Sequence, residues 1–184
     1  NNLKEEDVVV STTGKTSREL NEFSVKNKSK NPIFYSIGGM GHANQISLGI
    51  SNNCSKRVFC FDGDGSVIMH MGSVGIVGNN AKDNYYHILF NNGTHESVGG
   101  QPTIGDLINF ELLFKSLGYK DYYKLTSEND LSYFFKNTLD STKGPILIEI
   151  LVDSSSRPDL GRPNETPLEQ KNKFIKLFNN QKGE

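Results

Sequence analysis

The stretch RVFCFDGDGSVIMHMGSVGIVG, residues 57–78, contains both halves of one α/β unit. Its first part, VFCF, is a short continuous apolar run, which is typical of a strand buried on both faces of a parallel sheet. Its last part is apolar and long enough to form a helix. The polar turn DGDGS lies between them, so the stretch predicts a strand, a loop and a helix in that order.

The same order of elements recurs along most of the chain. Strands are predicted at Val8–Thr12, Ile33–Ile37, Val58–Phe61, Tyr86–Phe90, Tyr122–Leu125 and Ile146–Val152. Helices are predicted at Ser17–Phe23, Ala43–Ser51, Ser66–Gly78, Leu107–Leu117 and Asn129–Leu139. This alternation predicts a doubly wound α/β domain with a mainly parallel sheet and helices on both faces. Ligands of such domains bind beyond the carboxyl ends of the strands, so functional residues are expected there.

The length of 184 residues predicts a single domain that spans residues 1–184. Near its end, LEQKNKFIKLF predicts a helical extension over about residues 165–180. Four apolar side chains are expected on one face of this helix: Leu168, Phe174, Ile175 and Phe178. A chain that begins Asn1–Asn2 without Met is expected to be a fragment or a processed product.

The composition is that of an ordinary globular protein, with 35% hydrophobic and 22% charged residues and a formal net charge of −1. This charge disfavours general binding to nucleic acid. The apolar runs are too short to cross a membrane. Cys54 and Cys60 lack the spacing of a thiolate metal site, so two reduced thiols in the cytoplasm are expected. Cys60, within VFCF, is expected to be a small buried hydrophobe.

Asp64 stands between two glycines where the strand of the opening stretch should end. A carboxylate there is either a partner for the helix N-terminus or a ligand for a hard cation. Asn91 and Asn92 follow the next strand, and 28 positions separate Asp64 from Asn92. A right-handed crossover would bring the two strand ends together. Asp64 and Asn92 are therefore candidate Mg²⁺ ligands that leave room for phosphate oxygens.

The loop TTGKTS, residues 12–17, contains a GKT triplet like that of a phosphate loop. That signature also requires a glycine five positions before Gly14, where this chain has Val9, so a nucleotide triphosphatase is disfavoured. Small polar residues at a helix start still offer hydroxyl and N–H groups to an anion. The alternative is an ordinary N-cap by Thr16 or Ser17.

The loop GGMGHA, residues 38–43, does not complete a dinucleotide-binding fingerprint, because Asn44 occupies the position of the final glycine. Three glycines around Met40 indicate either a close approach of the backbone to a ligand or a tight turn. Met40 itself would offer a large, adaptable apolar surface.

Together these loops resemble a known family. GDGS (63–66) followed by NN (91–92) resembles the diphosphate-binding signature of thiamine diphosphate enzymes, and GGMG (38–41) resembles their turn beneath the cofactor rings. STTGKTSREL (11–20), THESVGGQPT (94–103) and SRPDLGRP (156–163) are similar to phosphonopyruvate decarboxylases. The resemblance covers nearly the whole chain. It implies the thiamine diphosphate-binding fold, and the carboxyl-terminal, diphosphate-binding domain of such an enzyme.

The resemblance also assigns roles to particular residues. The implied Mg²⁺ ligands are the side chains of Asp64 and Asn92 and the backbone carbonyl of Thr94. The diphosphate would lie against Thr13, Gly14, Thr16, Gly63, Gly65 and Ser66. The rings would lie against Gly38, Gly39 and Met40. The implied activity is decarboxylation of a small 2-oxo acid, phosphonopyruvate, to phosphonoacetaldehyde and CO₂.

In this family the glutamate that activates the cofactor belongs to a separate pyrimidine-binding domain, for which a chain of this length has no room. The resemblance therefore implies a partner, either a removed amino-terminal half or a separate subunit, in what is expected to be a homo-oligomer. Alone, the chain is expected to bind cofactor poorly and to be inactive.

Several other polar residues have two interpretations each. His95 and Glu96 are candidates for proton transfer near the reacting carbon, or parts of a solvated loop that orders on closure. His42 is a candidate for contact with the cofactor edge or for capping a helix. A structural role is expected for His70 and His87. Arg157 and Arg162 are candidates for pairing with a phosphonate, against the alternative of ordinary surface arginines.

The loop from Gly93 to Thr103 is predicted to be mobile without cofactor, because its partners are then absent. Two further functions stay open. A sulfopyruvate decarboxylase subunit would use the same chemistry on a substrate with a different tetrahedral anion. A non-catalytic binding or assembly module would keep the fold without turnover.

Overall fold

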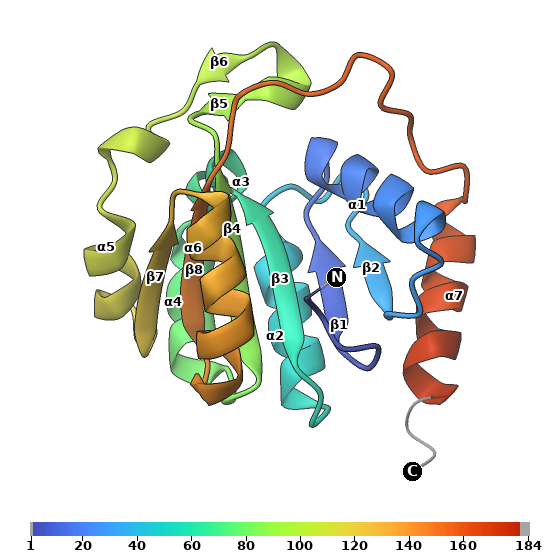
Figure 1. Ribbon diagram of the computed structural model, residues 1–184, viewed down its shortest axis with the longest axis horizontal. Helices are drawn as coiled ribbons and strands as arrows, with labels where there is room; N and C mark the ends of the chain where they lie inside the picture. The colour runs from blue at the N-terminus through green and yellow to red at the C-terminus, as the bar shows by residue number, and fades with distance from the viewer. Residues whose placement is uncertain (1, 181–184) are drawn as a thin grey trace.

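The computed structural model describes residues 2–180. Its centre is a six-stranded sheet with the strand order β2-β1-β3-β4-β8-β7 (Figure 1). These strands are β1 (Val8–Ser11), β2 (Ile33–Tyr35), β3 (Val58–Gly63), β4 (Tyr85–Asn91), β7 (Asp121–Leu125) and β8 (Ile146–Leu151). All of their pairings are parallel, so the predicted doubly wound α/β fold is confirmed.

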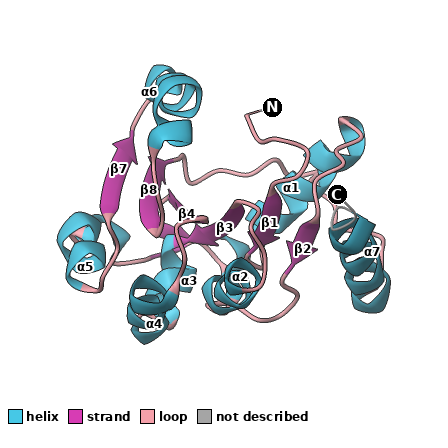
Figure 2. Cartoon of the chain, turned by 90° about the horizontal axis from the view of Figure 1, so that it is seen from below, coloured by secondary structure: helices cyan, strands magenta, loops and turns pink. Residues whose placement is uncertain are grey.

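Helices cover both faces of the sheet. They are α1 (Lys15–Lys26), α2 (Ala43–Asn52), α3 (Asp64–Met69), α4 (Gly72–Asn80), α5 (Phe110–Ser116), α6 (Glu128–Tyr133) and α7 (Pro167–Asn180). Figure 2 shows α2, α4 and α5 on one face, α1 and α6 on the other, and α7 beside the edge strand β2. Within residues 2–180, no helix combines the length and the apolarity that a bilayer crossing needs.

The core follows from the alternation of side chains along each strand. In β3, Phe59 belongs to the apolar cluster beneath α1 and α6, whereas Cys60 belongs to the cluster beneath α2, α4 and α5. Ile88 and Leu89 divide in the same way in β4. Both faces of the central strands are therefore buried, which explains why their sequences are continuous apolar runs.

The register of the sheet brings together the loops that the sequence singled out. Gly63 at the end of β3 pairs with Phe90 in β4, and Asn91 pairs with Leu151 in β8. Asp64 and Asn92, the next residue after each strand, are consequently neighbours at one edge of the sheet. The predicted crossover between the two strand ends is confirmed.

The predicted helix Ser66–Gly78 is wrong as a single element. The structure has two helices, α3 and α4, separated by His70 and Met71. His70 leaves the helical conformation with φ −127° and ψ 44°, and its carbonyl accepts hydrogen bonds from the backbone and hydroxyl of Ser73. Those bonds satisfy the carbonyl at the break and start the next helix in a new direction.

Two other predicted helices are each divided into shorter turns. The predicted helix Leu107–Leu117 begins at the last residue of a 3₁₀ turn, η2 (Gly105–Leu107), and its helical part is α5. The predicted helix Asn129–Leu139 is α6 continued by a π-helical turn, η3 (Phe134–Thr138), and a 3₁₀ turn, η4 (Leu139–Ser141). Phe134 and Leu139 are both buried there, so the wider turn still presents apolar side chains to the core.

The C-terminal helix packs through part of its predicted face. Phe174 makes an edge-to-face contact with Phe34 of β2, with ring centroids 5.6 Å apart, and Phe178 stacks on Phe174 at 5.7 Å. Leu168 and Ile175 are exposed, so not all of the four apolar side chains predicted for one helical face pack against the domain. Because β2 is a short edge strand, a narrow stripe of apolar side chains on α7 is enough to cover it.

Candidate functional site

A cavity with a volume of about 970 Å³ lies at the carboxyl edge of the sheet. Figure 1 shows the hairpin of β5 (Thr94–His95) and β6 (Gln101–Pro102) above these strand ends. The predicted site residues that line the cavity are Thr13, Gly14, Thr16, Met40, Gly63, Asp64, Gly65, Ser66, Asn92, Thr94, His95 and Glu96. Gly38 and Gly39 are not among the lining residues. The fold thus gathers loops from four strands around one space.

Asp64 is the first residue of α3 and is only 2% exposed. Gly63 occupies the N-cap position, and no side chain caps this helix, so the alternative of Asp64 as a capping residue is wrong. One carboxylate oxygen accepts a hydrogen bond from the hydroxyl of Thr103. Within residues 2–180, no lysine or arginine forms an ion pair with Asp64, so its charge lacks a cationic side-chain partner.

The second loop of the candidate metal site is a turn stabilised by its own asparagines. The Asn92 side-chain oxygen accepts a hydrogen bond from the backbone N–H of Thr94 at 3.1 Å. The Asn91 oxygen accepts one from Gly93 at 3.3 Å. The Thr94 hydroxyl oxygen is buried and has no hydrogen-bond partner within the part of the chain that the structure describes.

Glu149 of β8 binds the side chain of Asn91, with which this loop begins. Its carboxylate, 2% exposed, accepts a hydrogen bond from the Asn91 side-chain N–H₂ at 2.8 Å and another from the Tyr122 hydroxyl. Lys124 lies 3.8 Å from the same carboxylate. Burial, followed by the bond to Glu149, raises the pKa of Tyr122. A buried carboxylate with these partners holds the end of β4 in one orientation.

The first loop also differs from its simplest interpretation. Helix α1 begins at Lys15, after Gly14 at the N-cap position, and no side chain caps it. The alternative of an N-cap by Thr16 or Ser17 is therefore wrong. Ser17 instead donates its hydroxyl to the Thr12 carbonyl, and its oxygen lies 3.1 Å from the Ser11 hydroxyl. The first turn of α1 keeps N–H groups that no side chain caps, at the edge of the cavity.

Ser66 connects three of the four loops. Its hydroxyl lies 3.0 Å from that of Thr12 and accepts a hydrogen bond from the Gly41 backbone N–H at 2.9 Å. Met40, which precedes this glycine, lines the cavity. His42 follows it but does not line the cavity, and its ring contacts the Met40 carbonyl at 3.0 Å rather than capping α2.

His95 lies against the start of α3. A Cβ atom placed on Gly65 would lie 2.6 Å from the His95 ring and 3.5 Å from the Met40 methyl group. Glycine at position 65 therefore leaves room for the ring inside the cavity. Glu96 also lines the cavity, within a short 3₁₀ turn, η1 (Glu96–Val98).

The hairpin that carries His95 was not predicted from the sequence. Its two strands are only two residues long, too short for a periodic signal. The pair Gly99–Gly100 at its tip, with φ values of 128° and 74°, is the one sequence feature that could have indicated it. The predicted mobility of this loop without cofactor stays a prediction.

The two arginines of the candidate phosphonate site have different positions. Arg157 lines the cavity and forms an ion pair with Glu22 of α1, with Nη2 2.5 Å from Oε2. Arg162 does not line the cavity. His70 is exposed, and its ring lies 4.5 Å from that of His42, outside the cavity.

Asp64 has the environment of a cation ligand, because a buried carboxylate without a cationic partner is costly and a divalent ion removes that cost. The Asn92 amide oxygen and the Thr94 carbonyl belong to an adjacent loop, and hydroxyl-bearing loops complete the rim. Fold and site therefore define an α/β domain whose cavity offers hydroxyl and N–H groups to a phosphate-bearing ligand and a carboxylate to a cation.

The particular family follows from comparison with known proteins. Residues 12–150 match the sequence profile of the thiamine pyrophosphate enzyme, C-terminal TPP binding domain. The chain belongs to this family, and the resemblance inferred from its motifs is confirmed.

Two proteins with similar sequences are named as decarboxylases of 2-oxo acids. The chain is 37% identical over 172 residues to the phosphonopyruvate decarboxylase of Streptomyces viridochromogenes, covering 94% of this chain and 42% of that protein. It is 35% identical to the sulfopyruvate decarboxylase subunit beta of Methanocaldococcus jannaschii, covering 80% of this chain and 76% of that subunit. The chain thus spans about two fifths of the first of these proteins.

A solved structure supports the fold independently. The 2-oxoglutarate:ferredoxin oxidoreductase from Magnetococcus marinus superposes with a TM-score of 0.65, covering 88% of this chain and 63% of that chain. The sequence identity is 13%, so this similarity concerns the fold alone.

Proposed function

We propose that this chain supplies the diphosphate- and Mg²⁺-binding half of the active site of a phosphonopyruvate decarboxylase, which releases phosphonoacetaldehyde and CO₂. The observation that carries the proposal is the position of Asp64 beside the Asn92–Thr94 turn, on one cavity, in a chain 37% identical to a phosphonopyruvate decarboxylase.

Each part of the cavity has one task in this proposal. Asp64, Asn92 and the Thr94 carbonyl would hold Mg²⁺, because all three offer the oxygen ligands that this ion requires. The diphosphate would lie along Thr13, Gly14, Thr16, Gly63, Gly65 and Ser66. The rings would rest on Met40 and the turn at Gly38–Gly39. When bound, thiamine diphosphate supplies the electron sink that decarboxylation of a 2-oxo acid needs.

The hairpin provides the residues for proton transfer. His95 and Glu96 both line the cavity, and the hairpin lies above the strand ends (Figure 1). In the proposal, His95 or Glu96 exchanges a proton at the carbon from which CO₂ leaves, and the hairpin keeps water away from it. The place of His95 over Gly65, next to Met40, supports this assignment.

Arg157 is the candidate for recognition of the substrate anion, because it lines the cavity and Arg162 does not. Its guanidinium already pairs with Glu22 and lies 3.8 Å from Asp159. A phosphonate would therefore have to displace or share one of these carboxylates, which makes Arg157 a weaker anchor than a free arginine would be.

The proposed site needs a partner. The chain matches the carboxyl-terminal binding domain of its family and spans about two fifths of the phosphonopyruvate decarboxylases that it resembles. A pyrimidine-binding domain, in the same polypeptide or in a separate subunit, would close the cavity from the open side, within a homo-oligomer. Exposed apolar side chains on the hairpin and the following turn, Val98, Ile104 and Leu107, support a covered surface there.

Turnover by the complete enzyme tests this proposal. The chain is combined with its pyrimidine-binding half, and the rates with phosphonopyruvate and sulfopyruvate are compared with Mg²⁺ and thiamine diphosphate present. We expect faster turnover of phosphonopyruvate, and loss of both activities in Asp64→Ala. Faster turnover of sulfopyruvate would overturn the choice of substrate.

Sulfopyruvate decarboxylation is the second candidate because of one specific observation. The match covers 76% of a separate beta subunit with that name, so a subunit of about this size exists among the relatives. The third candidate function is that of a non-catalytic binding or assembly module. It would bind thiamine diphosphate and Mg²⁺ yet turn over neither acid when its partner half is present.

A further inference from the structure

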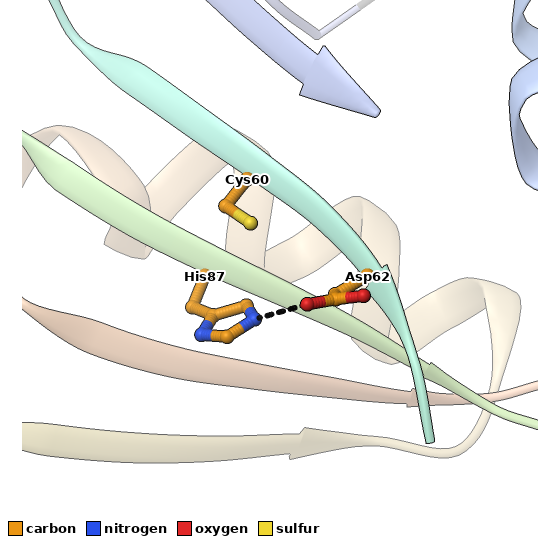
Figure 3. Close-up of side chains that lie close together, drawn as sticks. All are labelled: Cys60, Asp62 and His87. Atoms are coloured by element: carbon orange, nitrogen blue, oxygen red, sulfur yellow. Dashed lines mark ion pairs between the residues drawn. The ribbon is translucent and has the colours of Figure 1, made fainter. Parts of the chain in front are cut away.

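Three polar side chains lie together in the core beneath the cavity (Figure 3). Cys60 and Asp62 project from β3 and His87 from the neighbouring β4, and each is 0% exposed. None of the three lines the cavity, and the proposed function assigns them no role. A buried carboxylate and a buried imidazole are costly, so their presence requires an explanation.

A path of polar contacts connects this cluster to the metal loop. The Tyr119 hydroxyl lies 2.9 Å from Nδ1 of His87, and Nε2 of His87 lies 3.5 Å from Oδ2 of Asp62. The other Asp62 oxygen accepts a hydrogen bond from the Gly63 backbone N–H at 3.1 Å. Gly63 directly precedes Asp64, so the path ends at the residue that begins the candidate metal site.

We assign the hydrogen positions along this path from the chemistry of its groups. Nε2 faces the Asp62 carboxylate, which accepts, so we place the ring proton on Nε2, and the Tyr119 hydroxyl then donates to Nδ1. Nε2 and Oδ2 form no hydrogen bond within residues 2–180, so this 3.5 Å contact is the polar contact available to both atoms. The contact joins Asp62, the last residue but one of β3, to His87, the third residue of β4.

We propose that Asp62 and His87 are a positioning pair for the metal site. His87, oriented by Tyr119, fixes the Asp62 carboxylate, and Asp62 fixes the Gly63 peptide and hence the direction in which Asp64 leaves β3. The inference rests on the proposed function, because Asp64 must be a metal ligand for its direction to matter. Partners behind metal ligands are a general means of orienting them.

The same three side chains invite a second interpretation as a metal centre. Their ligand atoms lie within 4.8 Å of one another. However, the cluster contains only three such side chains among residues 2–180, whereas a closed structural zinc site has four ligands. Burial also raises the pKa of the Cys60 thiol, which disfavours the thiolate that a metal binds. The path of polar contacts therefore accounts for the cluster better.

Substitutions at His87 test the positioning role in the complete enzyme. Mg²⁺ affinity is measured by calorimetry at saturating thiamine diphosphate, together with the melting temperature of each variant without Mg²⁺. His87→Leu removes the donor and should weaken Mg²⁺ binding by roughly tenfold, the lower end of what outer partners of metal ligands contribute. His87→Gln retains an N–H donor at similar reach and should recover most of that loss.

Two further variants separate positioning from packing and from a buried metal. Tyr119→Phe deletes a single oxygen and should weaken Mg²⁺ binding by about threefold, a part of the loss expected for an outer partner. Cys60→Ala removes the neighbour that is outside the path and should leave Mg²⁺ affinity unchanged. Elemental analysis of the unsubstituted protein should find no zinc bound in a one-to-one ratio.

The outcomes are distinguishable. If the unsubstituted enzyme binds no Mg²⁺ with thiamine diphosphate, the proposed function fails and the positioning role fails with it. If the unsubstituted enzyme binds Mg²⁺ and His87→Leu binds it equally well, the positioning role alone is overturned. Equal losses in His87→Leu and His87→Gln would also overturn it, because they would indicate packing. Stoichiometric zinc that disappears in Cys60→Ala would replace it with a buried metal centre.

Discussion

The hydroxyl of Thr103 donates a hydrogen bond to the carboxylate of Asp64, although 39 positions separate the two residues in the chain. The contact joins the far end of the β5–β6 hairpin to the start of α3. It means that the hairpin is positioned by the same carboxylate that we assign to Mg²⁺. Hairpin and metal loop should therefore respond together to substitutions at either residue.

Replacing Thr103 tests this coupling. Thr103→Val keeps the shape of the side chain but cannot donate to Asp64, so we expect roughly tenfold weaker Mg²⁺ binding in the complete enzyme. Thr103→Ser retains the hydroxyl and should keep most of the affinity. Calorimetry with saturating thiamine diphosphate measures both. Equal affinities in the two variants would show that the bond to Asp64 does not orient the metal ligand.

Gly65 tests the placement of the cofactor. A methyl group at this position would lie 2.6 Å from the His95 ring, inside the cavity. Gly65→Ala should therefore lower thiamine diphosphate affinity by at least about tenfold, because overpacking at a well-fitted site is costly.

Gly49 in α2 provides a matched control for Gly65, since a Cβ there would meet nothing within 4 Å. Gly49→Ala should leave cofactor affinity unchanged and stabilise the helix slightly. Unchanged thiamine diphosphate binding in Gly65→Ala would contradict the position of the diphosphate.

The buried pair of Asp7 and Arg57 tests the stability of the opposite end of the sheet. Arg57 donates to both Asp7 oxygens, at 2.8 and 2.6 Å, and the Asp7 side chain is 1% exposed. Asp7→Asn should lower the free energy of unfolding by about 2 kcal/mol, because the guanidinium loses its buried charged partner and keeps the exposed Asp140. Glu111→Gln removes an exposed partner of Lys115 and should change it by less than about 0.5 kcal/mol. Denaturant unfolding compares the two. A similar loss of unfolding free energy in both variants would contradict the expectation that the buried pair contributes more than the exposed pair.

Tyr35 gives the fold a dependence on alkaline pH. Burial raises the pKa of this phenol from 10.0 to about 12, against the opposing effect of a hydrogen bond with Ser24. Below pH 10 the phenol keeps its proton in the folded and unfolded chain alike. Between about pH 10 and 12 only the unfolded chain loses it, so stability should fall as the pH rises through this window. The free energy of unfolding of Tyr35→Phe should fall less steeply with rising pH, as measured by urea unfolding at several pH values. Parallel curves for the two proteins would exclude this contribution.

The fold could be predicted from the sequence because its strands are buried on both faces. Runs such as VFCF carry no alternation, and that absence itself distinguishes parallel strands covered by two layers of helices. The break at His70 could not be predicted, because the segment stays apolar on both sides of it. It depends on how Ser73 bonds to the His70 carbonyl, which local composition does not reveal.

The rule for parallel sheets predicted the candidate site where its residues follow strands directly, and the family resemblance predicted the others. Asp64 and Asn92 come straight after β3 and β4, so the rule for parallel sheets places them together. Thr103 was missed because it follows a hairpin too short to have a periodic pattern. His87 was expected to be structural and Cys60 simply hydrophobic. The Asp62–His87 contact depends on which residues of β3 and β4 share a face, and register fixes that only after folding.

The most direct test of the central claim is the position of the metal. A crystal structure of the complete enzyme with thiamine diphosphate, and with Mn²⁺ in place of Mg²⁺, would locate the ion by its anomalous scattering. The account predicts one peak bound by the side chains of Asp64 and Asn92 and by the Thr94 carbonyl, touching the diphosphate. A peak elsewhere, or a bound cofactor whose ion touches neither Asp64 nor Asn92, would contradict it.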